Sequence, residues 1–158
     1  MQIGKGLLAT VLWAVVVLGS AVSAQKASPD RNQKLVQLRK LALASSNYIV
    51  EMDSKMYDTF VEQSPRPYTV IILFYSANNE ASEDVYKEYI FAAGHWKDKE
   101  THFTQLHGGK EFKRPIFFAA VKFSQDTMRI YRDLDLRGVP DVLVSTPQEV
   151  SFKDPLER

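Results

Sequence analysis

The chain of 158 residues contains no cysteine. Thiol–disulfide exchange requires a thiolate nucleophile, so this absence excludes a thiol oxidoreductase. It also removes the disulfides on which small secreted domains often depend, so the hydrophobic core alone has to stabilise the fold. The sequence also lacks an Asn-x-Ser/Thr triplet, and the chain is therefore not itself a substrate for N-glycosylation.

An excess of either charge is also missing. The chain has 20 Lys and Arg residues against 19 Asp and Glu residues, and its formal net charge is +1. That charge falls to zero without Lys5, which lies in the N-terminal segment discussed next. Nucleic acids and acidic lipids bind surfaces with a basic excess, so neither is expected as a partner.

One long apolar run, Leu7 to Val22, lies near the N-terminus behind Lys5. Because small residues follow at Val22-Ser23-Ala24, we predict a cleaved signal peptide over residues 1–24. A membrane anchor is the alternative, but the run is short and no basic residues follow it. Residues 25–147 are then the folded domain, and residues 148–158 are a C-terminal tail.

The residue pattern in the first part of the domain predicts a helix, a strand and a second helix, in that order. Lys34–Ala44 has apolar residues at helical spacing, and Tyr48–Met52 is rich in strand formers. Asp53 has the side chain of a helix N-cap, and we expect the helix that follows it to end before Pro65.

Two continuous apolar runs, Thr69–Tyr75 and Pro115–Phe123, are typical of strands buried on both faces of a largely parallel sheet. Between them, apolar residues from Val85 to Trp96 predict one face of a helix. We expect Lys97–Arg114, which is charged and has no clear period, to be a surface insertion.

The last elements are a short helix and a strand. Ser124 or Asp126 is expected to cap a helix that contains Met128 and Leu134. Gly138-Val139-Pro140 then turns the chain into a strand at Asp141–Ser145. Strands and helices alternate along the domain, and this order predicts an α/β fold.

A buried strand, a loop, a long helix and a later Val-Pro turn resemble the thioredoxin fold. The chain also resembles the lumenal domain of the accessory subunits of oligosaccharyltransferase. The segments that carry this closer resemblance are Pro65–Phe74, Tyr86–Trp96, Pro115–Phe118 and Gly138–Pro140. These form the subunit 3/subunit 6 family, which includes tumour-suppressor-candidate and magnesium-transporter proteins. The resemblance implies a thioredoxin-like mixed sheet flanked by helices, incomplete at the C-terminus.

Redox members of that family carry Cys-x-x-Cys at the start of the long helix. The resemblance puts Asn79 and Ser82 at these positions, and neither residue can form a mixed disulfide. It also implies a cis Val139–Pro140 bond facing this loop, although only about 5–6% of X–Pro bonds are cis. We therefore expect Asn79, Ser82, Val139 and Pro140 to bind extended polypeptide non-covalently. A loop and a helix cap explain Asn79 and Ser82 equally well.

The function that the resemblance implies is that of a non-catalytic subunit of the oligosaccharyltransferase complex in the endoplasmic reticulum. Its partners would be the other subunits and nascent polypeptide clients. Family members continue into four transmembrane helices, whereas this chain ends at Arg158. We therefore expect a fragment or a short form, with membrane association only through the complex or through such helices. The alternatives are the lumenal part of a magnesium-transport protein, a secreted redox-inactive thioredoxin-like peptide binder, and a secreted enzyme of unknown type.

Other site types lack their residue patterns. His95, His102 and His107 are spaced by seven and five residues, which matches neither a paired helical arrangement nor a zinc finger, so no metal or other cofactor is expected. Gly108-Gly109-Lys110 lacks the remaining residues of a phosphate loop, and no Gly-x-Ser-x-Gly elbow occurs. The aromatic residues are expected in the core rather than on a ligand platform, namely Tyr89, Trp96, Phe117 and Phe118.

Overall fold

The computed structural model of the chain describes residues 31–64, 66–112 and 114–147. The expected signal peptide and C-terminal tail lie outside these residues. The described elements follow one another in the order α1 (Arg31–Ala44), β1 (Ile49–Glu51), α2 (Ser54–Tyr57), η1 (Asp58–Glu62), β2 (Thr69–Tyr75), α3 (Glu80–Leu106), β3 (Ile116–Lys122), α4 (Met128–Asp133) and β4 (Asp141–Ser145).

The four strands form one mixed sheet in the order β1-β3-β2-β4. Strands β1 and β2 both run parallel to β3, and β4 runs antiparallel to β2. In this register Leu73 of β2 lies between Ala120 of β3 and Val142 of β4. The predicted α/β fold class and buried central strands are confirmed.

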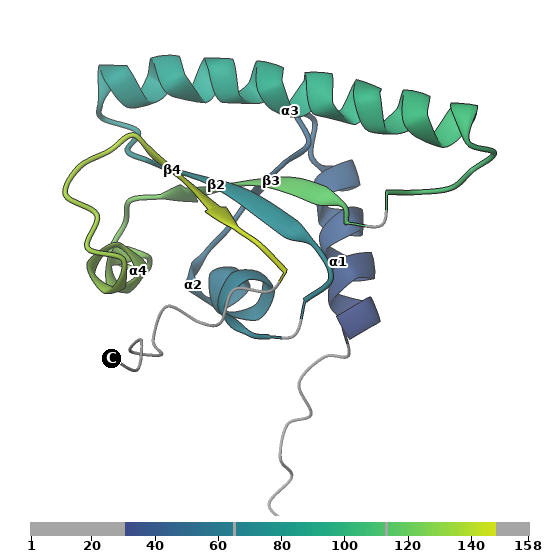
Figure 1. The fold of residues 1–158 in the computed structure, drawn as a ribbon. Coiled ribbons are helices and arrows are strands. Elements are labelled where there is room, and N and C mark those ends of the chain that lie inside the picture. The colour runs from purple at the N-terminus through teal and green to yellow at the C-terminus, as the bar shows by residue number, and fades with distance from the viewer. Residues whose placement is uncertain (1–30, 65, 113, 148–158) are drawn as a thin grey trace, which may run out of the picture.

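Helices cover both faces of the sheet, with α3 on one face and α1, α2 and α4 on the other (Figure 1). Side chains alternate along the central strands, so Phe74 faces α2 and α4 while Leu73 faces α3. On the α3 face, Tyr89 and Ala93 pack against Phe118. Phe117, Phe118 and Tyr89 are buried, as expected of core residues, and Trp96 is half-buried against the same cluster.

The prediction of a surface insertion from Lys97 was wrong over its first ten residues, because α3 continues to Leu106. Phe112 returns along the helix and stacks on Phe103 and Trp96, with ring centroids 4.2 and 5.7 Å apart. The helix ends where Gly108 and Gly109 adopt positive φ angles of 63° and 83°.

The two predicted helix caps had different outcomes. Asp53 is the N-cap of α2, and its Oδ1 accepts a hydrogen bond of 2.7 Å from the Met56 amide, as predicted. The cap predicted for the last helix was wrong, because Thr127 precedes α4 and makes no side-chain cap bond. Asp126 instead accepts from the Ser54 amide at 2.9 Å, and so ties the loop before α4 to α2.

Candidate binding site

An open pocket of about 670 Å³ lies where β2 and β3 end. Its wall comes from four places in the chain: the loop after β2, the residue that follows β3, helix α4, and the loop that leads into β4. Ligands of α/β folds commonly bind outside the carboxyl ends of parallel strands. The topology therefore brings segments that are more than 40 residues apart in the sequence to one candidate site.

The apolar part of this pocket is exposed. Phe123 and Met128 leave 46% and 39% of their surface accessible, and half-buried Leu136 and Val139 line the same pocket. Large apolar side chains are usually buried, so their gathering around one hollow makes this surface a candidate binding site.

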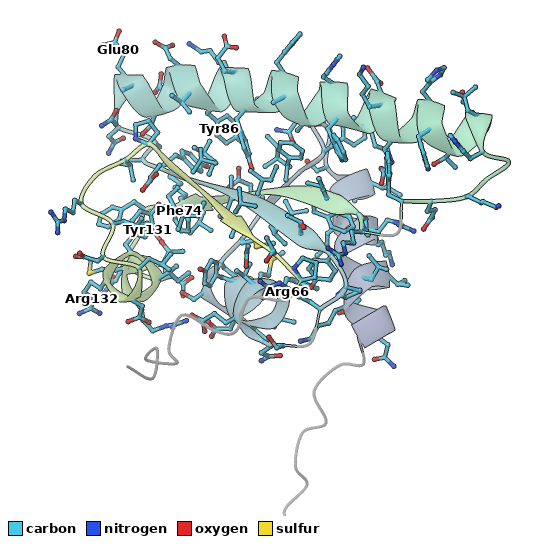
Figure 2. All side chains as sticks on the ribbon, in the orientation of Figure 1. Arg66, Phe74, Glu80, Tyr86, Tyr131 and Arg132 are labelled. Carbon is cyan, nitrogen blue, oxygen red and sulfur yellow. The ribbon has the colours of Figure 1, made fainter. Side chains whose placement is uncertain are left out.

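Tyr131 supports this wall from beneath Phe123. Its ring packs edge-on against Phe123 and Phe74, with centroids 5.1 and 5.4 Å apart, and Figure 2 shows Phe74 and Tyr131 close together beside α4. The phenol donates to the Val121 carbonyl at 2.7 Å, and burial raises the pKa of Tyr131 above its usual range. This hydroxyl is therefore already engaged by main-chain carbonyls of the two central strands.

The N-terminus of α3 contributes Asn79 and, beneath the surface, Ser82. Asn79 lines the pocket, and its Oδ1 accepts from the Ser82 amide at 3.0 Å as the N-cap of α3. Ser82 is fully buried, and its Oγ accepts from the Ser76 amide at 3.3 Å. The helix-cap explanation is confirmed for Asn79, whereas Ser82 is a buried residue of the first turn of α3 and does not line the pocket.

The Val139–Pro140 peptide bond is cis, as the resemblance implied. Val139 is half-buried against the core and lines the pocket together with Asn79, so the structure brings these two expected residues to one site. Pro140 is half-buried at the next position and leads directly into β4.

The charged rim and the apolar wall were not predicted. Arg132, Asp135 and Arg137 line the pocket, and the Arg137 guanidinium lies 3.6 Å from the exposed Asp135 carboxylate. Among the described residues, Arg132 forms no ion pair. The signal that could have found Phe123 and Met128 is topological, because both follow β3 at the edge where β2 also ends.

The three histidines are exposed on α3 and at its C-terminal end, where His107 stacks on Phe103 at 4.0 Å. Within residues 31–64, 66–112 and 114–147, no group of three or more His, Asp or Glu side chains is placed to hold a metal ion. In the same part of the chain, no helix combines the length and the apolar character that crossing a bilayer requires.

Comparison with family models matches residues 36–157 to the OST3/OST6 family, which is also described as a transporter family. The chain belongs to the OST3/OST6 family. This is a family of accessory subunits, and membership supports a role related to oligosaccharyltransferase and a place in the endoplasmic reticulum. Comparison with curated proteins gave no match.

Solved structures similar to this chain include thioredoxins and a thioredoxin domain of a protein disulfide-isomerase. Thioredoxin f from spinach chloroplast is 10% identical, with a TM-score of 0.50 over 75% of this chain and 84% of that one. The first thioredoxin domain of mouse protein disulfide-isomerase A4 is 18% identical, with a TM-score of 0.48 over 72% and 69% of the two chains. At these identities the spinach structure shows the fold alone, and the predicted thioredoxin-like class is confirmed.

Proposed function

We propose that this chain is a redox-inactive subunit of oligosaccharyltransferase that holds extended acceptor polypeptide non-covalently in the pocket beside Val139. The observation that carries the proposal is the composition of this pocket. It combines exposed Phe123 and Met128 with the Asn79 cap and the cis Val139–Pro140 bond, in a chain that has no thiol. A site of this kind can retain a client but cannot form a covalent bond with its sulfur.

The backbone around Val139 supports an extended ligand in particular. Val139 immediately precedes Pro140 and β4, a strand whose described pairing is with β2. An extended segment laid beside Val139 could exchange main-chain hydrogen bonds there, while its side chains enter the pocket. Main-chain recognition tolerates many sequences, which suits a protein that serves many clients.

Retention without chemistry is sufficient to aid glycosylation. A polypeptide held next to the catalytic subunit presents its acceptor sites at a high effective concentration. The bound segment also stays unfolded, so an Asn-x-Ser/Thr site reaches the catalytic subunit before folding buries it. Weak, reversible binding is enough for this role, because the client has to leave after modification.

Two glycine substitutions test the pocket directly. Gly138 lines the pocket, Gly94 lies in α3, and an added Cβ meets no atom within 4 Å at either position. We expect Gly138→Trp to lower the affinity of the full chain for an unfolded acceptor peptide at least about tenfold by filling the pocket, and Gly94→Trp to leave it unchanged. Fluorescence anisotropy measures both, and equal affinity in the two variants would exclude the pocket.

Isolation of the tagged full chain from microsomes tests the assignment to the complex. We expect the catalytic oligosaccharyltransferase subunit to be recovered with both the parent chain and the Gly138→Trp variant, because complex formation does not require the pocket. A chain recovered free of that subunit would contradict this assignment and favour a secreted peptide binder.

A further inference from the structure

We propose that the pocket selects polypeptide segments in which a large apolar side chain has an acidic residue next to it. This inference rests on the proposed function and adds a client preference to it. Two independent features of the pocket carry it, the exposed apolar wall and the charge of the rim.

The apolar wall favours a large side chain. Phe123 and Met128 are 46% and 39% exposed, and Leu136 adds a half-buried apolar surface to the same pocket. A space of about 670 Å³ accommodates a Phe, Trp, Leu or Met side chain together with the backbone that carries it. Such a side chain would cover both exposed residues, and its aromatic or thioether groups make favourable contacts with them. An alanine or serine at that position of the client would leave Phe123 and Met128 exposed to water.

The charged rim of the pocket favours an acidic residue next to the apolar residue of the client. Its charged members are Arg132 and Arg137 against the single carboxylate of Asp135, so the rim is positive in a chain that is otherwise nearly neutral. The Asp135–Arg137 contact of 3.6 Å is exposed on both sides and is therefore weak, which leaves both guanidinium groups open to a client carboxylate. The other polar wall residues, Ser76, Asn78 and Asn79, are uncharged, and Asn79 caps the positive end of the α3 dipole.

The other acidic residues on the elements around the pocket, exposed Asp141 at the start of β4 among them, do not line it. Glu80 and Glu83 occupy the first turn of α3, but neither lines the pocket. Asp133 lies on α4 and is engaged by Arg129 at 3.0 Å. We therefore expect a client with Asp or Glu beside its apolar residue to bind better than one with Lys at the same position.

Three labelled nine-residue peptides of a Gly-Ser host test both features by fluorescence anisotropy with the full chain. Their central pairs are Phe-Asp, Phe-Lys and Ala-Asp. We expect the Ala-Asp peptide to bind at least about tenfold more weakly than Phe-Asp, because it lacks the apolar group. Phe-Lys should bind about threefold more weakly at low salt, and about 0.5 M salt should remove that difference.

Matched variants assign each preference to its residues. Phe123→Ser should remove most of the preference for Phe over Ala, whereas Phe91→Ser, at a residue that is 74% exposed on α3, should not. Arg137→Glu should abolish or reverse the preference for Asp over Lys, whereas Lys99→Glu, the same charge change on exposed α3 surface, should not.

Two results would overturn the inference, and only the second of them would also exclude the proposed function. Equal binding of the three peptides would exclude the client preference and keep the proposed function. Failure of all three peptides and of an unfolded acceptor to bind would exclude the proposed function as well.

Discussion

The two ends of strand β2 are built in opposite ways. Before Thr69, the buried Arg66 side chain donates hydrogen bonds to the Val61 carbonyl, the Ser145 hydroxyl and the Thr146 carbonyl. After Tyr75, the chain leaves apolar side chains exposed around an open pocket. We call these the closed end and the open end.

The closed end also buries Lys34, whose Nζ donates to the Gln63 carbonyl at 2.9 Å. Burial and, to a smaller extent, the nearby Arg66 charge lower the pKa of Lys34. A buried cation is tolerated only where hydrogen bonds replace its water, so the polar contacts of this end are needed for stability. The closed end is thus held by buried polar contacts, whereas the open end carries the exposed surface that we propose for binding.

The largest effect on stability is expected at the closed end. Arg66→Ala removes the hydrogen bonds to Val61, Ser145 and Thr146 from a buried charged donor and should lower the free energy of unfolding by about 3 kcal/mol. Urea unfolding followed by circular dichroism measures this. The control, exposed Arg114→Ala, should change it by less than about 0.5 kcal/mol. A similar loss of unfolding free energy in both variants would contradict the view that buried polar contacts stabilise the closed end.

Alkaline pH should destabilise the fold at the closed end through ionisation of Tyr68. Burial raises the pKa of Tyr68 to about 12, although the Arg66 charge opposes the shift. The unfolded chain ionises near pH 10, so it loses protons before the folded chain does, and stability falls as pH rises from about 10 to 12. The urea midpoint should drop over this range, and less steeply in Tyr68→Phe. A midpoint that stays constant to pH 12 would contradict the burial of this phenol.

A smaller effect is expected from Tyr131→Phe at the open end. The substitution removes the hydrogen bond to the Val121 carbonyl and should cost about 1 kcal/mol of unfolding free energy. The ring that supports the pocket remains, so peptide affinity should not change. If affinity fell together with stability, the hydroxyl would have a role in the pocket that its contacts do not indicate.

The smallest effects should come from exposed apolar residues. Phe123→Ser and Phe91→Ser should each change the unfolding free energy by less than about 1 kcal/mol, because both side chains already contact water. Thermal or urea unfolding of the two variants checks this. A much larger loss in Phe123→Ser would show that this residue belongs to the core rather than to a binding surface.

The sequence alone predicted the elements that carry a strong local pattern. Strand β2 was predicted over its observed bounds, because a continuous apolar run fits a strand buried on both faces. Asp53 was identified as an N-cap, because the cap depends only on a carboxylate and the amides that follow it. The family resemblance, rather than any pattern in the residues, predicted the cis bond before Pro140.

Two features were missed, the helical state of the second half of α3 and the exposure of two pocket residues. The second half of α3 is charged, and its helical state is supported by the Lys97–Glu100 ion pair at 2.9 Å and by stacking of Phe103 on Phe112. Phe123 was predicted on a strand and Met128 on a helix, and nothing in their residue types indicates that they remain exposed. Their role emerges only when the topology brings the ends of β2 and β3 together.

The central claim is that the open end holds extended polypeptide. The most direct test is photo-crosslinking of the full chain with a Phe-Asp peptide whose Phe is replaced by benzoylphenylalanine, followed by mass spectrometry of the adducts. We expect adducts at Phe123, Met128 and the loop before β4, and we expect Gly138→Trp but not Gly94→Trp to remove them. Adducts along the outer face of α3, unchanged by Gly138→Trp, would contradict it.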